Sequence, residues 1–515
     1  EISACLVGSE MCIRDRHKEG IRILTFLPFY YSYNSYTKAP NNAEAEKWRK
    51  FGIPEELITY AMQCNRLFSR NPDISDWEIG NEPHAWKITA ADYAQQAKTA
   101  RIVAAEQKHP IRLVLGDMNF IYQSVIGDAD AARFTDAVAI HCYGFFKHGY
   151  DHGIPNRVEK LKRVLAERGE PDKPVWMTEI SGCGYWSTIY PGSNQEEVHR
   201  YQALDLPKKM LGCRALGVDK IFFYQFFDTV IDGNEGSFGL TDSRFFPKPA
   251  LMVYRVIVEL FEGAKYEGKM ILPKHITGFQ FSRDNQPCAV IWREDKPKYL
   301  IRRSPGVKQP MVPIGTPEQI TLQAATPVEL YDLMGNLTTL IPEEGKVIVP
   351  VCEYPIFLRG EFKVTLDRNY GKVKAEHKTL PVAKLQFLPT LPVISNLSSL
   401  HNMQMGLRMD LKRNVQQNIS LRVHNLRDHA IEGTVTLNPP INFDDDGWQI
   451  KPESISVKIP ANGAATVSFK VKTGIMENLT TQLYILGAEF KSGNEIVRDN
   501  VMIRPVHASG KLPIY

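Results

Sequence analysis

The strongest constraint on the fold is a regular alternation of short apolar segments with longer helical segments between residues 17 and about 262. Such a chain folds as successive βα units, whose parallel strands form a sheet covered by helices. Strands are predicted at residues 21–26, 75–79, 112–116, 137–141, 175–179 and 220–226. Helices are predicted at residues 43–50, 55–69, 90–106, 157–168 and 195–211. Residues 17–262 are therefore predicted to form one α/β domain.

The pattern changes after Pro249, where short strands separated by turn residues replace the long helices. Residues 263–361 are predicted to form a small β domain, and three prolines mark a linker at 362–394. From residue 395 the chain alternates apolar and polar positions, with a turn at Asn462-Gly463, which is typical of an immunoglobulin-like β-sandwich. A length of 515 residues fits about three domains of roughly 150 residues each.

The composition excludes several classes of protein. The 62 basic and 58 acidic residues are mixed along the chain, so no nucleic-acid partner is expected. The longest apolar run, Ile221 to Phe227, has the length of a strand, and no membrane span is expected. The eight cysteines are scattered without a CxxC pair, which argues against structural zinc and against a disulfide framework.

The first sixteen residues do not fit the pattern that follows them. They lack the charged-then-apolar order of a signal peptide, and CLVGSEMCIRDR resembles translated sequencing-adapter read-through from an environmental assembly. Residues 1–16 are therefore predicted to be a non-native segment, and a genuine short helix is the alternative. The localisation stays open, with an extracellular or periplasmic location as the expectation.

Two predicted strands end near a glutamate, at the face of a parallel sheet where barrel enzymes place their chemistry. Glu82 follows the strand at 75–79 within the run Asn-Glu-Pro, and Glu179 ends the strand at 175–179. Glycosidic cleavage needs one protonated carboxyl group for the leaving oxygen and one ionised carboxylate for the anomeric carbon. When the two carboxyl groups lie about 5–5.5 Å apart, the ionised group acts as the nucleophile and the configuration at the anomeric carbon is retained. Either glutamate alone could cap a helix or pair with an arginine; the two together favour a glycosidase.

The Asn-Glu-Pro run, with a second glutamate three strands later, resembles clan A of the glycoside hydrolases, and families 39 and 5 are the most similar. These are retaining enzymes built on a (β/α)8 TIM barrel. The resemblance implies that Glu82 is the general acid/base and Glu179 the nucleophile. It also implies that Asn81 hydrogen-bonds the sugar 2-hydroxyl, while His141 and Tyr143 line the sugar subsite. The resemblance covers about residues 17–360.

Two features depart from the family pattern. In the family pattern, the acid/base glutamate follows the fourth barrel strand. The strand before Glu82 would then be the fourth and the segment at 21–26 the third, so the expected fold is a TIM barrel without its first two strands. The last predicted strand carries Tyr224, where family 5 enzymes place a tryptophan.

Three further side chains lie on the loops that follow the predicted strands. Trp86 and Trp186 each follow a strand that carries a candidate glutamate, where they could stack on a sugar ring or pack as lids over the core. Asp117 could reach substrate hydroxyls or stabilise a turn.

No metal or organic cofactor is expected. His148 and His152 have a spacing that could bind zinc on a helix, but glycines beside both favour a loop, and no third ligand is evident. The acidic run at 442–447, with Glu453, matches calcium-loop spacing, yet its strand-like flanks and Pro452 favour a hairpin turn.

The sequence therefore predicts a retaining hydrolase that cleaves O-glycosidic, β-linked bonds of oligo- or polysaccharides by double displacement. A non-catalytic carbohydrate-binding protein or a structural surface protein with a degenerate barrel remains an alternative, and a transglycosylase would use the same residues. The C-terminal sandwich is either a spacer or a carbohydrate-binding unit, and the spacer is favoured because its lone tryptophan, Trp448, gives no platform for binding sugars. The sugar, the linkage and the oligomeric state are not set by the sequence.

Overall fold

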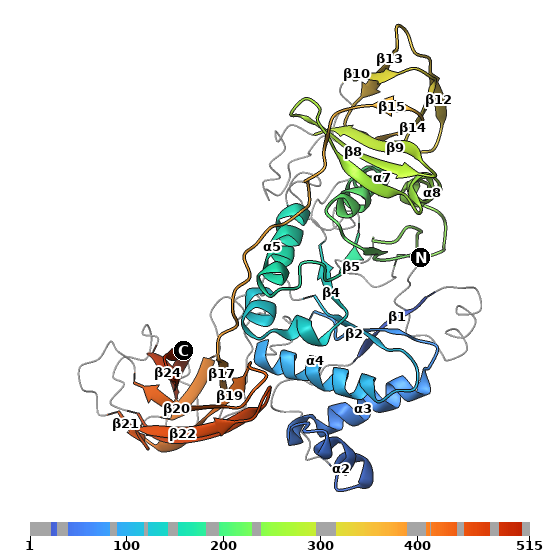
Figure 1. Cartoon of the computed structure of the whole chain (residues 1–515). Helices are drawn as coiled ribbons and strands as arrows, with labels where there is room; N and C mark the ends of the chain where they lie inside the picture. The colour runs from blue at the N-terminus through green and yellow to red at the C-terminus, as the bar shows by residue number, and fades with distance from the viewer. Residues whose placement is uncertain are drawn as a thin grey trace. The chain divides into compact units, whose positions relative to one another are not determined.

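The computed structural model describes residues 22–27, 40–82, 90–117, 122–142, 153–181, 195–228, 238–294, 316–388, 408–412, 414–439, 448–473 and 484–506. The chain forms two compact units, and Figure 1 labels many of their elements. The first unit comprises the described residues of Glu1–Thr25, Ala137–Ala166 and Pro171–Ala375, and the second comprises those of Phe26–Asp136, Glu167–Glu170 and Glu376–Tyr515. Each unit therefore combines α/β elements with a region of antiparallel strands.

The α/β part of the second unit contains two paired parallel strands, β2 (Asp76–Ile79) and β3 (Arg112–Leu115), in register from Asp76 opposite Arg112 to Ile79 opposite Leu115. The Gly80 N–H donates to the carbonyl of Leu27, at the end of β1 (Leu24–Leu27). The α-helices are α2 (Ala43–Lys50), α3 (Ile58–Arg70) and α4 (Ala90–Ala105), with the short 3₁₀ helices η1 (Glu55–Leu57) and η4 (Ala131–Phe134) and the π-helix η3 (Gln123–Asp128). Helix α2 begins at a capping Asn42, whose side chain accepts from the Ala45 N–H.

The α/β part of the first unit contains the parallel strands β4 (Ala137–His141), β5 (Val175–Ile180) and β6 (Lys220–Phe223), paired in chain order. Its helices are α5 (Ile154–Glu167), α7 (Gln195–Ala215) and α8 (Pro249–Phe261). Every residue of β4 is buried, as its continuous apolar run predicts for a parallel strand covered on both faces. Every residue of β6, the last strand in the sheet order, is only partly buried.

The strands and helices predicted between residues 17 and 262 are all present, with ends that differ from the prediction by a few residues. The α/β class, with parallel strands followed by antiparallel sheets, is confirmed. No helix among the described residues is both long enough and apolar enough to cross a membrane. The five cysteines that the structure describes are free thiols.

The first unit continues into two antiparallel sheets that enclose an aliphatic core. One sheet has seven strands in the order β12-β11-β14-β9-β8-β7-β16, and the other has three in the order β13-β10-β15. Their bounds are β7 (Lys265–Met270), β8 (Ile276–Arg283), β9 (Gln286–Arg293), β10 (Glu318–Ala324), β11 (Val328–Tyr331), β12 (Leu337–Leu340), β13 (Lys346–Val351), β14 (Ile356–Arg359), β15 (Phe362–Lys363) and β16 (Leu366–Asp367).

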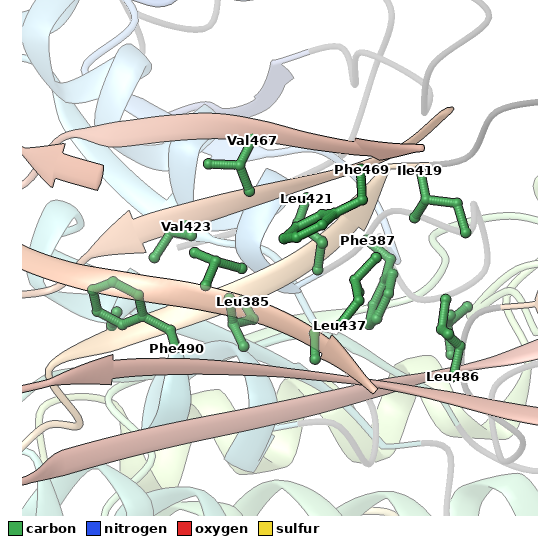
Figure 2. Close-up of a cluster of buried hydrophobic side chains, with 14 of the residues drawn as sticks. Leu385, Phe387, Ile419, Leu421, Val423, Leu437, Val467, Phe469, Leu486 and Phe490 are labelled. Carbon is green, nitrogen blue, oxygen red and sulfur yellow. The ribbon is translucent and has the colours of Figure 1, made fainter. Parts of the chain in front are cut away.

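The second unit ends in a two-sheet β-sandwich, with strand orders β17-β19-β23-β21 and β18-β25-β24-β20-β22. Its core is a layer of aliphatic and aromatic side chains, among them Phe387, Leu421, Phe469 and Phe490 (Figure 2). The bounds are β17 (Ala383–Leu388), β18 (Arg408–Lys412), β19 (Gln416–Asn425), β20 (Ile431–Asn438), β21 (Gln449–Lys451), β22 (Ser454–Ile459), β23 (Ala464–Lys472), β24 (Tyr484–Ser492) and β25 (Glu495–Val506).

A chain of hydrogen bonds joins the sandwich to helix α4 within the second unit. The Gln95 amide lies 3.3 Å from His424 Nδ1, and His424 Nε2 lies 2.7 Å from Gln386 Oε1. The Gln386 amide in turn donates to Asp92 at 2.8 Å. His424 and Gln386 are each only 2% exposed, so this contact holds a neutral imidazole between an amide donor and an amide acceptor.

His424 predicts a loss of stability in acid. Burial, with the nearby Arg422, Lys98 and Lys384, lowers the pKa of His424 to about 3. An unfolded histidine titrates near ~6.5, so between about pH 6.5 and 3 the unfolded chain binds a proton that the folded chain does not, and the free energy of unfolding falls as pH falls. Because of this group, the free energy of unfolding measured with urea is expected to be about 2 kcal/mol lower at pH 5 than at pH 7.5. Glutamine does not titrate, so the free energy of unfolding of the His424→Gln variant should depend less on pH. An equal pH dependence in the variant and the wild-type protein would contradict the assignment.

Candidate functional site

An irregularity in strand pairing places Glu179 opposite His141. Strands β4 and β5 pair regularly up to Ile140 opposite Met177, and the next pair is His141 opposite Glu179. Thr178 is therefore an extra residue on β5. Because strand side chains alternate between faces, one inserted residue re-aims all that follow. Without the bulge, His141 would lie opposite Thr178.

The Glu179 cluster consists of His141, Thr178 and Glu179. His141 Nδ1 lies 3.6 Å from Glu179 Oε2, and His141 Nε2 lies 3.0 Å from the Thr178 hydroxyl oxygen. The side chain of His141 is 2% exposed and that of Glu179 is 15% exposed. In the tautomer with its proton on Nδ1, the imidazole points an N–H toward the carboxylate, while Nε2 accepts from Thr178. This arrangement places an imidazole nitrogen beside a carboxylate that has limited access to solvent.

Tyr224 lies on the next strand end of the same unit. Its backbone N–H donates to the carbonyl of Ile180 at 2.7 Å, so the chain after β6 continues beside the end of β5. Its ring packs edge-on against Phe238, with centroids 6.1 Å apart. The structure thus brings together His141, Glu179 and the strand end of Tyr224, which the sequence had selected separately.

A buried ion pair supports the end of β5. The Lys209 ammonium group donates to the carbonyl of Ser181 at 2.7 Å and lies 2.5 Å from the Asp205 carboxylate. Lys209, Asp205 and Ser181 are 1–3% exposed. The sequence alone does not reveal this pair, although Asp205 and Lys209 have the i,i+4 spacing of a helical ion pair, because spacing does not show which helix face is buried.

The Glu82 cluster, in the second unit, consists of Asn81, Glu82 and Asp117. Asn81 and Glu82 directly follow β2 and Gly80 and are half-buried, while Asp117 lies two residues beyond the end of β3 and is 1% exposed. One carboxylate oxygen of Glu82 and one of Asp117 lie within 4.8 Å of each other. Asp117 also accepts a hydrogen bond from the Tyr122 hydroxyl at 3.3 Å.

The two clusters belong to different units: Glu82 to the second and Glu179 to the first. The pairing of these carboxylates across one cleft stays a prediction. Tyr143, Trp86 and Trp186 lie outside the described residues, as do His148 and His152.

Comparison with models of known protein families gives no match, and neither does comparison with curated proteins. Among solved structures, the chain is similar to a family 39 glycoside hydrolase from Bacteroides cellulosilyticus WH2, with 19% identity and a TM-score of 0.49 over 69% of this chain and 71% of that one. It is also similar to a β-glucuronidase from Bacteroides uniformis, with 13% identity and a TM-score of 0.34 over 98% of this chain and 61% of that one. A β-glucuronidase from Ruminococcus gnavus has 16% identity and a TM-score of 0.32 over 49% of this chain and 41% of that one. The chain spans less than two thirds of both β-glucuronidases.

The buried ion pair predicts a large stability effect. Lys209→Met leaves the Asp205 carboxylate buried without its cation and is expected to lower the free energy of unfolding by about 3–5 kcal/mol. Arg255→Met is the matched control, because Arg255 and Glu259 form an i,i+4 pair whose side chains are 66% and 55% exposed. The control is expected to change stability by less than about 0.5 kcal/mol. Denaturant unfolding of both variants tests this, and equal effects would refute the assigned role of burial.

Proposed function

We propose that this protein is a retaining glycoside hydrolase of the clan A type, in which the parallel strands belong to a (β/α)8 barrel. The observation that carries the proposal is the Glu179 cluster: a carboxylate on a parallel strand, 15% exposed, with His141 Nδ1 3.6 Å from it. A nucleophilic carboxylate must be ionised, positioned and partly shielded from water. The contact of Glu179 with His141 and its limited exposure support this role.

In the first step, the Glu179 carboxylate attacks the anomeric carbon and the bond to the leaving oxygen breaks. The carboxyl group of Glu82 gives its proton to that oxygen, and an ester joins the sugar to Glu179. In the second step, the Glu82 carboxylate takes a proton from water, whose oxygen attacks the anomeric carbon and releases Glu179.

The remaining candidates would hold the sugar. Asn81, beside Glu82, would bond the 2-hydroxyl, and Tyr143 would line the same subsite as His141. The rings of Trp86, Trp186 and Tyr224 would contact the apolar faces of sugar rings. The substrate class proposed is a β-linked oligo- or polysaccharide.

Kinetics of glutamate variants test the proposal. The protein is assayed with a panel of aryl β-glycosides. Glu179→Gln is expected to abolish turnover, since no nucleophile remains. In Glu82→Gln, the rate of turnover is expected to fall about 10²–10⁴-fold with phenyl glycosides, whose leaving group needs an acid. The rate should fall far less with 2,4-dinitrophenyl glycosides, whose leaving group does not need one. Glu259→Gln, on the exposed face of α8, is the control that should keep wild-type rates.

Covalent labelling tests the nucleophile directly. A 2-deoxy-2-fluoro glycosyl fluoride should trap an ester on the peptide that contains Glu179, detected by mass spectrometry. Folded protein that binds glycans without turnover, and that binds equally well after Glu179→Gln, would instead identify a carbohydrate-binding protein and overturn the proposal.

A further inference from the structure

A buried tyrosine bridges the ends of the two strands that precede the Glu82 cluster. Tyr93 lies in α4 and is fully buried. Its hydroxyl donates to the carbonyl of Ile79 at 2.6 Å and accepts from the N–H of Gly116 at 2.8 Å. Ile79 is the last residue of β2, and Gly116 follows the last residue of β3. The phenol therefore links a carbonyl on one strand to an amide on the next, just where direct pairing ends.

Gly116 makes room for this bridge. A Cβ at this position would lie 2.7 Å from the Gly80 carbonyl oxygen, 2.9 Å from that of Ile79 and 3.1 Å from the Tyr93 hydroxyl. Two of these contacts are with backbone atoms, which cannot move aside as a flexible side chain can. The close approach of the β2 turn to β3 therefore requires glycine here.

The chain beyond the bridge passes through two residues of positive φ, and this conformation is unfavourable at Glu82, which has a Cβ, but not at Gly80. Gly80 has φ of 68° and Glu82 has φ of 47°. The left-handed region costs a residue with a Cβ about 1–2 kcal/mol, and it persists where surrounding contacts hold it. Tyr93 provides such contacts one residue before Gly80 and one residue before Asp117. Burial raises the pKa of Tyr93 well above its usual range, so the hydroxyl keeps its proton at working pH.

We infer that Tyr93 is a positioning residue that locks the ends of β2 and β3 and thereby sets the placement of Glu82 beside Asp117. The inference rests on the proposed function, because it assigns Tyr93 to the acid/base half of the reaction. Loss of the hydroxyl would leave the Gly116 N–H and the Ile79 carbonyl without their shared partner, and the strand ends would relax. Proton delivery by Glu82 would suffer, while nucleophilic attack by Glu179 would not.

The test compares Tyr93→Phe with Tyr60→Phe in the full chain. Tyr60 is a fully buried tyrosine of the same unit whose hydroxyl interacts with Cys64 on its own helix, so its loss controls for a missing buried hydroxyl. For Tyr93→Phe, kcat/KM is expected to fall about ten-fold or more with phenyl glycosides and less than about two-fold with 2,4-dinitrophenyl glycosides, because only the first need the acid. Tyr60→Phe should show no dependence on the leaving group. A uniform loss in Tyr93→Phe, or none, would overturn the inference.

Hydrogen exchange gives a second readout that needs neither turnover nor a folded variant. In the wild-type protein, the Gly116 amide should exchange as slowly as the buried amides of β3, and exchange at the rate of a free peptide would overturn the inference.

The kinetic test distinguishes failure of the proposed function from failure of the inference about Tyr93. If the wild-type protein cleaves no glycoside, the proposed function fails and the role of Tyr93 in it fails too. If the wild-type protein is active and Tyr93→Phe matches Tyr60→Phe, only the inference about Tyr93 fails.

Discussion

The ladder of backbone hydrogen bonds between parallel strands is the constraint on which the candidate site depends. Where such a ladder stops, the last carbonyl and amide groups need other partners, because a buried backbone group without one is costly. Side chains from the covering helices supply them here: Lys209 of α7 bonds the carbonyl of Ser181, and Tyr93 of α4 bonds Ile79 and Gly116. The two carbonyl groups that these side chains bond lie within a few residues of the candidate glutamates along the chain.

Buried ion pairs also provide partners for backbone groups at the ends of strands and loops. Asp205 with Lys209, and Asp228 with Lys248, are pairs whose residues are at most 8% exposed. Moving such pairs from water costs several kcal/mol per ion, so they are poor sources of net stability. Each makes a directional contact with backbone: Lys209 with Ser181, and Asp228 with the N–H of Gly239. Their value lies in fixing loop and strand ends, which apolar packing cannot do with the same precision.

The sequence predicted the strands and helices of the α/β region well, because burial on both faces leaves continuous apolar runs such as the one in β4. It also selected Glu179 and His141, since each ends a predicted strand. It missed Lys209 and Asp205, because an i,i+4 pair has the same spacing on a buried face as on an exposed one. Tyr93 was equally hidden, since nothing along the chain shows that a helix side chain reaches across two strand ends.

What the sequence by itself determined is the order of βα units and the residue types that end each strand, both properties of local pattern. Only the tertiary structure decided which of those residues meet. The bulge at Thr178 sets Glu179 opposite His141, and the pairing of β4 with β5 that defines it is a relation between two segments separated by helix α5. A one-residue shift in register reverses every side chain that follows, and the energies that choose the register come from contacts across strands.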